Sequence, residues 1–220
     1  MTKLSLSAEE LILVNNTDWI LSKHRIVKNI YEFLGTLLPK FEQEVIKCSY
    51  LFPDNIQYQT GKISRGENYR LLPYVILDYP AFFWKNNILA IRTMFWWGNF
   101  FSITLHLSGI NKNRYTSNQE QIFEWLKLHD YSVCDNIDEW EHHSGTGNYR
   151  PAKSVSDIEF AKILAKDFYK MAKFLPLTDY SNAEVYLLER FREILNFLQL
   201  SYQGDEINLS PVFPITGSGL

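Results

Sequence analysis

Cysteine is scarce in this chain of 220 residues, and its scarcity excludes a disulfide framework or a cysteine-based metal motif. The two cysteines, Cys48 and Cys134, lie in unlike surroundings, and neither belongs to a CxxC motif. Each is predicted to be a reduced residue that packs as a small apolar side chain. A chain of this length buries enough surface to fold without a covalent or metal staple.

Neither sign of charge dominates the composition. The chain has 22 Lys and Arg residues against 25 Asp and Glu residues, which gives a net charge of −3. This balance provides no electrostatic reason to expect a nucleic acid or an anionic membrane as a partner. The first residues, Met1–Glu10, also lack the apolar core of a signal peptide, so a cytoplasmic location is expected.

Long uninterrupted apolar runs are absent as well. Residues 88–107 have the length of a membrane-spanning helix and carry only Arg92 and His106 as ionisable groups. The segment is interrupted at Gly98-Asn99, and its second half alternates apolar and polar residues, which is typical of a β-hairpin. A membrane partner is therefore not expected.

No motif of a known catalytic or cofactor site is found in the sequence. The chain has no GxSxG nucleophile elbow, no dinucleotide-binding fingerprint and no Walker loop. Gly145-Thr146-Gly147 lacks the GK[ST] ending of a phosphate-binding loop and is interpreted as a turn. The sequence identifies no reaction and no cofactor, and it leaves open whether the protein is an enzyme.

The order of the predicted elements is helices, then strands, then helices, which indicates a single α+β domain over residues 1–220. Apolar spacing and capping residues predict helices over 7–14, 18–38, 39–49, 117–128, 157–174 and 182–200, with Pro39 opening the third. Aromatic and β-branched residues predict strands over 74–79, 89–97, 100–108 and 131–134. Residues 53–70 are predicted to be irregular or weakly extended, and the tail from Gly204 is predicted to be irregular.

The expected architecture is an antiparallel sheet with a central aromatic hairpin over about residues 89–108, packed by the N-terminal and C-terminal helices. Gly98-Asn99 fits a two-residue turn, which would place Trp97 opposite Phe100 and Thr93 opposite Thr104. In this register Arg92 shares an apolar, helix-packed face with Phe101, Ile103, Leu105 and Leu107. The other face carries Leu89, Ile91, Phe95, Trp97, Thr104 and His106. A shift of one residue would exchange the faces.

Arg92 is the first candidate binding residue. A guanidinium group in an apolar strand face needs a carboxylate partner or access to solvent, and Asp78 and Glu67 are the expected partners. Two interpretations stay open. Arg92 either forms a structural ion pair or binds the carboxylate or phosphate group of a ligand.

A small anionic or polar ligand bound over the sheet is the first functional hypothesis. Its candidate binding residues are Arg92, His106, Trp97, Thr104 and Arg65, which combine cations, an aromatic ring and hydrogen-bonding groups. Alternatively, a helix or a partner subunit covers the mixed face of the hairpin. The protein would then be a non-catalytic interaction module or a homo-oligomer.

Residues 135–143 hold the densest concentration of metal-ligand types in the chain. His142, His143, Asp138 and Glu139 are the candidate ligands, because carboxylates and imidazoles bind Zn, Mn or Fe(II). This set predicts a metal-dependent hydrolase as an alternative function. The spacing lacks HExxH, so a solvated acidic loop is the competing interpretation.

Two segments resemble uncharacterised bacterial proteins. Asn15-Asn16-Thr17-Asp18-Trp19 with Lys23 resembles the NN..DW...K pattern of a bacterial domain of unknown function. The stretch from Arg92 to Phe101 (RTMFWWGNFF) is similar to a segment of other uncharacterised bacterial proteins. The basic residues expected after the first helices are matched only in part, by Lys62, Arg65 and Arg70. The resemblance implies an α+β fold and a bacterial origin, and it carries no activity.

Overall fold

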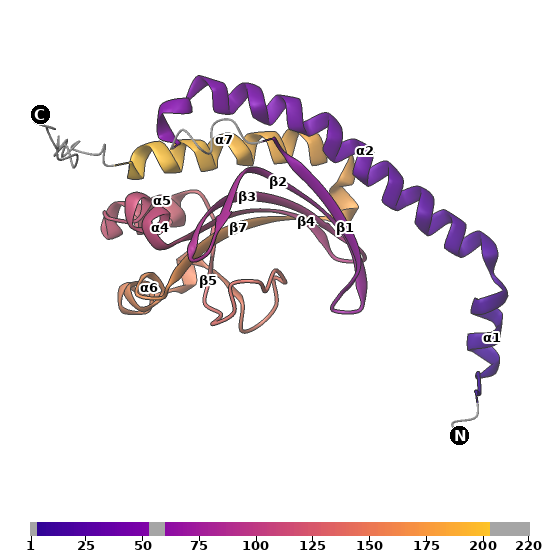
Figure 1. Cartoon of the computed structure of the whole chain (residues 1–220). Helices are drawn as coiled ribbons and strands as arrows, with labels where there is room; N and C mark the ends of the chain where they lie inside the picture. The colour runs from indigo at the N-terminus through magenta and orange to yellow at the C-terminus, as the bar shows by residue number, and fades with distance from the viewer. Residues whose placement is uncertain (1–3, 53–59, 203–220) are drawn as a thin grey trace, which may run out of the picture.

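The computed structural model describes residues 4–52 and 60–202, which form helices packed on a seven-stranded antiparallel sheet (Figure 1). This arrangement confirms the predicted α+β class. The strand order is β1-β2-β3-β4-β7-β5-β6. The strands are β1 (Lys62–Tyr69), β2 (Leu72–Trp84), β3 (Asn87–Trp96), β4 (Phe100–Ser108), β5 (Ser132–Cys134), β6 (Tyr149–Pro151) and β7 (Phe168–Pro176). The α-helices are α1 (Ala8–Asn15), α2 (Thr17–Lys47), α4 (Gly109–Tyr115), α5 (Gln119–Leu128), α6 (Asp157–Leu164) and α7 (Ala183–Ser201), and short 3-10 helices are η1 (Ser49–Leu51), η2 (Ala152–Ser154) and η3 (Leu177–Asn182).

One face of the sheet is covered by α2 and α7, which lie side by side over it (Figure 1). The helices contribute a stripe of buried apolar side chains, and the rings of Phe41 and Phe191 stack with their centroids 4.0 Å apart. The strands contribute every second residue, including Ile91 and Ile103. We call this surface the helix-covered face. It contains the main hydrophobic core.

The first long helix is continuous, which corrects the prediction of separate helices over 18–38 and 39–49. Helix α2 passes through Pro39, although proline has no N–H to donate to the preceding turn. Leu34, Leu37 and Phe41 lie on both sides of Pro39, and all are buried against the same core. Their packing holds the helix together across the position where the local sequence favours a break.

The predicted helix over 157–174 is wrong in its second half. Helix α6 ends at Leu164, and residues 168–176 form strand β7, which pairs with β4 along its whole length. Apolar residues in this segment fit a helical spacing and an alternating one equally well, so the local pattern does not decide between them. Pairing with β4 favours a strand over a helix for residues 168–176, because the edge of β4 satisfies the backbone hydrogen bonds of a strand.

Two further segments differ from expectation. Residues 62–69 form the edge strand β1, which fits the extended alternative and excludes the irregular one, and β4 leads directly into the unpredicted helix α4. Strand β2 also extends well beyond the predicted 74–79. The helices predicted at 7–14, 117–128 and 182–200 and the strand at 131–134 are confirmed within one or two residues. Residues 53–59 and the tail from Gly204 lie outside the described residues.

The aromatic hairpin is present, but its register differs by one residue from the prediction. Trp96, not Trp97, lies opposite Phe100, and Arg92 lies opposite Thr104. The connection has three residues, in which only Gly98 has positive φ (71°) and the Asn99 N–H donates to the Trp96 carbonyl. One positive φ at this position is typical of a type II turn, whereas the predicted turn requires a different backbone.

The register change moves all of β4 to the opposite assignment. Phe101, Ile103, Leu105 and Leu107 now join Leu89, Ile91 and Phe95 on the helix-covered face. Thr104 and His106 move to the other face, beside Arg92. The correction therefore separates the apolar residues from the polar ones more cleanly than the predicted register did.

Candidate functional site

The candidate site lies on the sheet face opposite α2 and α7, which we call the polar face. It is overlain by the β5–β6 loop, defined as residues 135–148, on the opposite side of the sheet from the two long helices (Figure 1). Arg92, Thr104, His106 and Lys170 stand on neighbouring strands of this face, as the pairings of Arg92 with Thr104 and of His106 with Lys170 require. The loop faces them with Glu139, Glu141 and His142.

Arg92 is held by the predicted carboxylate, Asp78. Its Nε donates to Oδ1 at 2.7 Å and its Nη2 donates to Oδ2 at 2.9 Å, so the ion pair is bidentate. The two residues are cross-strand partners on β2 and β3. The pair is largely buried, with side-chain exposures of 14% for Arg92 and 9% for Asp78. Glu67, the other expected partner, instead forms an ion pair with Lys23.

The third contact of Arg92 fixes the protonation state of His142. The Arg92 Nη1 lies 2.9 Å from the His142 Nε2, and a guanidinium can only donate, so the ring nitrogen accepts. His142 is therefore neutral. Burial, and then the nearby charges of Lys170 and Arg92, hold the pKa of His142 well below its ordinary value, which agrees with this assignment.

Lys170 and His106 attach the loop at a second point. Lys170 is completely buried and donates to the backbone carbonyls of Glu139 (2.8 Å) and Glu141 (2.6 Å). Burial lowers the pKa of the Lys170 ammonium to about 8. The His106 Nε2 lies 2.9 Å from the Glu139 carboxylate, and this hydrogen bond lowers the pKa of Glu139. Burial lowers the pKa of His106, so the pair consists of a neutral imidazole donor and a carboxylate.

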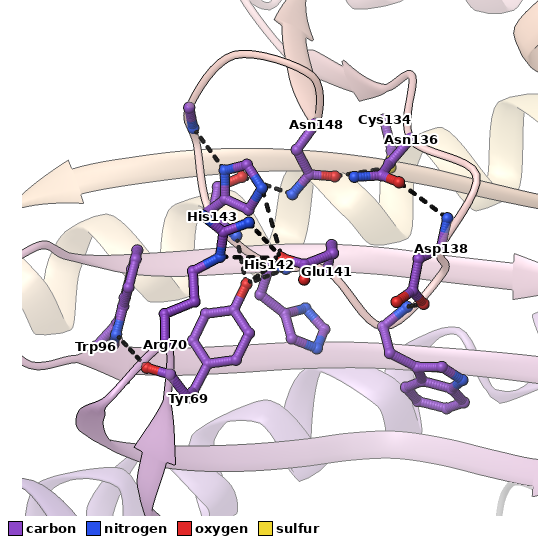
Figure 2. A network of polar contacts seen from close by, with 12 residues as sticks. Tyr69, Arg70, Trp96, Cys134, Asn136, Asp138, Glu141, His142, His143 and Asn148 are labelled. Atoms are coloured by element: carbon purple, nitrogen blue, oxygen red, sulfur yellow. Dashed lines mark hydrogen bonds and ion pairs between the residues drawn. The ribbon is translucent and has the colours of Figure 1, made fainter.

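Tyr69, at the end of β1, attaches the loop at a third point (Figure 2). Its hydroxyl accepts from the backbone N–H groups of His142 (2.7 Å) and His143 (2.9 Å) and donates to Glu141 Oε2 at 2.9 Å. Glu141 also forms an ion pair with Arg70 at 3.2 Å. Four side chains from four different strands thus hold the loop: Tyr69, Arg92, His106 and Lys170.

The loop is also braced from within. Asn148 is fully buried and donates to the His143 carbonyl at 2.6 Å, and it accepts from the Cys134 thiol at 3.3 Å (Figure 2). The backbone N–H of Trp140 donates to the Asp138 carboxylate at 2.8 Å. A loop with this many internal and external hydrogen bonds is expected to hold one conformation.

Trp140 is the loop residue that lines two cavities beside Arg92. Its ring packs against Phe83 and His106, with ring centroids 6.3 and 5.5 Å away. Arg92 and Trp140 line two neighbouring cavities, one of about 720 Å³ and one of about 210 Å³. The larger cavity is lined by Thr60, Gly61, Lys62, Ile63, Ser64, Asp78, Ala81, Phe83, Arg92 and Trp140. We call it the β1–β3 cavity. Its volume is in the range of small-molecule sites.

The structure brings together only part of the predicted ligand-binding set. Arg92, Thr104 and His106 stand side by side on the polar face. Trp97 lies in the hairpin turn and packs against the helix-covered core, with its ring 6.3 Å from Phe95. Arg65 is exposed on β1 opposite Val75, whose side chain is in that same core, so Arg65 points to the helix side as well. Trp97 was assigned to the site because of the incorrect register, and Arg65 because its segment was expected to form a loop over the sheet.

The four predicted metal ligands do not converge. Asp138 accepts from the Trp140 N–H, Glu139 pairs with His106, His142 accepts from Arg92, and His143 Nδ1 accepts from Gly145 N–H at 3.1 Å. In the part of the chain that the structure describes, no cluster of three or more His, Cys, Asp and Glu side chains is arranged to hold a metal ion. The polar groups of the segment hold it to the sheet, so the loop is not freely solvated.

Sequence reasoning missed Lys170, Tyr69, Trp140 and Phe83. Lys170 lay inside a segment predicted to be helical, and Tyr69 lay inside one predicted to be irregular. No local signal pointed to Lys170, because the apolar residues around it also fit a helical spacing.

Searches of known protein families, curated proteins and solved structures find no match to this chain. The resemblance to a bacterial domain of unknown function thus stays a prediction. Within residues 4–52 and 60–202, no helix is both long and apolar enough to cross a bilayer.

Proposed function

We propose that this protein binds a small anionic ligand with a planar apolar portion in the β1–β3 cavity, with Arg92 as the anchor. The observation that carries the proposal is the donor inventory of Arg92. A guanidinium has five N–H donors, and three of them bond Asp78 and His142. One donor on each terminal nitrogen is left without a hydrogen bond among the described residues, at the lining of an open cavity.

A carboxylate or phosphate is the group that suits these donors. Each has two or more oxygens that can accept from an arginine in a bidentate arrangement, and such bonds are about twice as strong as neutral ones. Lys62 lines the same cavity and adds a second positive charge, which outweighs the single negative charge of Asp78. The charged groups of the lining therefore favour an anion.

The apolar portion of the ligand is assigned from the aromatic residues of the lining. Phe83 is 44% exposed and Trp140 is 47% exposed, and both line the cavity. Exposed aromatic rings beside a cation stack on flat rings and supply much of the contact area in small-molecule sites. The hydroxyl of Ser64 offers an additional hydrogen-bonding group.

A series of isosteric probes tests the charge requirement. Benzoate, benzamide and benzamidine share one ring but carry a negative, no and a positive charge. Calorimetric titration is expected to detect benzoate and phenyl phosphate binding at millimolar concentrations or below, with benzamide weaker and benzamidine undetectable. Equal binding of all three probes, or binding of benzamidine alone, contradicts the proposal.

Two pairs of variants test the location. Lys62→Ala is expected to weaken benzoate binding about 2- to 5-fold, as for loss of one partly solvated ion pair. Phe83→Ala is expected to weaken it about 3- to 10-fold through loss of an aromatic contact. Arg65→Ala and Trp84→Ala are the controls, because these exposed neighbours do not line the cavity and should leave the affinity unchanged. All four variants keep the buried Arg92–Asp78 pair intact.

A further inference from the structure

We propose that the N-terminal arm, defined as residues 4–21, packs against the arm of a second copy of this chain and forms a homodimer. Every residue of the arm is exposed, and α1 has no buried residue. Figure 1 shows α1 and the first turns of α2 extending beyond the sheet. The arm nevertheless carries many large apolar side chains: Leu4, Leu6, Leu11, Ile12, Leu13, Val14, Trp19, Ile20 and Leu21.

The apolar stripe of α2 continues past the edge of the sheet. Ile20, Val27, Leu34 and Phe41 recur at a spacing of seven residues, which is the spacing of a helix–helix seam. Their exposures are 38%, 6%, 0% and 1%, so the same stripe is covered everywhere except in the arm. A second helix that packs on Ile20 and Trp19 would complete the seam.

Helix α1 also needs a partner. It has eight residues, and isolated helices shorter than about 12 residues are marginal in water. Its run Leu11-Ile12-Leu13-Val14 places apolar side chains on every side of the helix, a pattern typical of a buried helix. Packing between two copies would supply the burial that one copy does not.

Charge complementarity identifies the second copy as the partner. The arm contains acidic residues and no Lys, Arg or His: its charged residues are Glu9, Glu10 and Asp18. The next turns of α2 are basic, and Arg25 and Lys28 are exposed there. In an antiparallel arrangement about a two-fold axis, the acidic arm of each copy lies beside the basic turns of the other. An anionic lipid surface would instead repel the acidic arm.

The size of the contact is sufficient for a specific dimer. The two helical pieces, residues 8–15 of α1 and 17–28 of α2, meet at the non-helical Asn16 and together measure about 30 Å at 1.5 Å per residue, and half of a cylinder of this length and about 10 Å wide is about 500 Å². Two copies together bury about 1,000 Å², which reaches the lower limit for a specific interface. The interface lies away from the β1–β3 cavity and does not depend on ligand binding.

The test is sedimentation velocity of the full chain from about 1 to 100 μM, because a dimer in mass-action equilibrium changes its populated fraction with concentration. Trp19→Ala is expected to raise the dimer dissociation constant at least about 10-fold, because each dimer loses two central aromatic contacts. Leu128→Ala is the matched control, since Leu128 is 77% exposed at the end of α5 and outside the arm. Circular dichroism checks that each variant keeps its melting temperature.

A charge-exchange experiment distinguishes a second copy from any other partner. The Glu9→Lys, Glu10→Lys variant and the Arg25→Glu, Lys28→Glu variant should each be monomeric, because like charges meet in their homodimers. Mixed together, they should form a heterodimer, because opposite charges meet again at both contacts. A monomer at every concentration, a dimer that the arm variants do not weaken, or a mixture that stays monomeric overturns the proposal. Sedimentation with phosphatidylcholine vesicles in the absence of self-association overturns it too.

Discussion

The buried lysine of the polar face gives the sharpest prediction about this molecule. Lys170 is completely buried, and its hydrogen bonds go to two backbone carbonyls instead of a carboxylate. Its pKa is lowered by burial from 10.5 to about 8, so above pH 8 the folded protein loses this proton before the unfolded chain does. Between these two values the unfolded state binds more protons, and the free energy of unfolding must rise with pH.

The magnitude follows from the two pKa values. Where Lys170 is neutral in the folded state and protonated in the unfolded state, the free energy of unfolding rises by about 1.4 kcal/mol per unit of pH. This rise begins gradually around pH 8. Between pH 7 and pH 9 the Lys170 contribution to the free energy of unfolding should increase by about 1.3 kcal/mol. The neutral amine keeps two N–H donors, so both carbonyls of the β5–β6 loop can remain bonded.

The assay is urea denaturation of the natural protein and of Lys170→Met at pH 7, 8 and 9. The variant removes the titrating group, so the difference between the two curves cancels most other groups. The free energy of unfolding of the natural protein minus that of Lys170→Met should increase by about 1.3 kcal/mol from pH 7 to pH 9, whatever its value at pH 7. If this difference stays constant or decreases as the pH rises, the reasoning that burial lowers the pKa of Lys170 is refuted.

Three other substitutions probe the site and the scaffold. Asp78→Ala leaves the Arg92 guanidinium largely buried without its carboxylate and should lower the free energy of unfolding by about 3 to 5 kcal/mol, measured by urea denaturation. Tyr69→Phe removes the hydroxyl that accepts from two loop N–H groups and should cost about 1 to 3 kcal/mol, with faster hydrogen exchange at those amides. Pro39→Ala restores a hydrogen bond to the Gly35 carbonyl inside α2 at an exposed position and should stabilise the protein by about 1 to 3 kcal/mol, seen as a higher melting temperature.

The elements with a strong local signal were predictable from the sequence. The helices predicted from residues 7 and 117 begin within two residues of those positions, capped by Ser7 and Asn118, and Gly98 lies in the hairpin connection. The cost of burying a guanidinium also predicted a carboxylate partner for Arg92, and of the two candidates, Asp78 and Glu67, Asp78 forms the ion pair. These predictions depend only on neighbours in sequence or on the cost of burying charge.

The elements that depend on distant partners were not predictable. The register of the hairpin depends on whether the connecting loop has two residues or three. This difference decides whether Thr104 and His106 lie on the same face of the sheet as Arg92. Strand β7 exists because β4 offers it an edge, and the segment from Phe168 to Leu175 has no local feature that excludes a helix. The polar face was therefore hidden from sequence analysis, although most of its residues were named.

The structural and the ligand-binding interpretations of Arg92 are compatible once its geometry is known. Asp78 bonds two donors on one edge of the guanidinium, and His142 bonds a third from the loop. These contacts offset much of the cost of removing the charge from water, and they also fix its orientation. A guanidinium oriented in this way loses little further entropy when an anion binds its remaining donors, so the structural ion pair supplies the preorganisation that binding requires. The β5–β6 loop extends this logic, because the buried polar groups that hold it also hold Trp140 beside the cavity. The buried polar groups of this sheet face thus hold two side chains, Arg92 and Trp140, at the lining of both cavities.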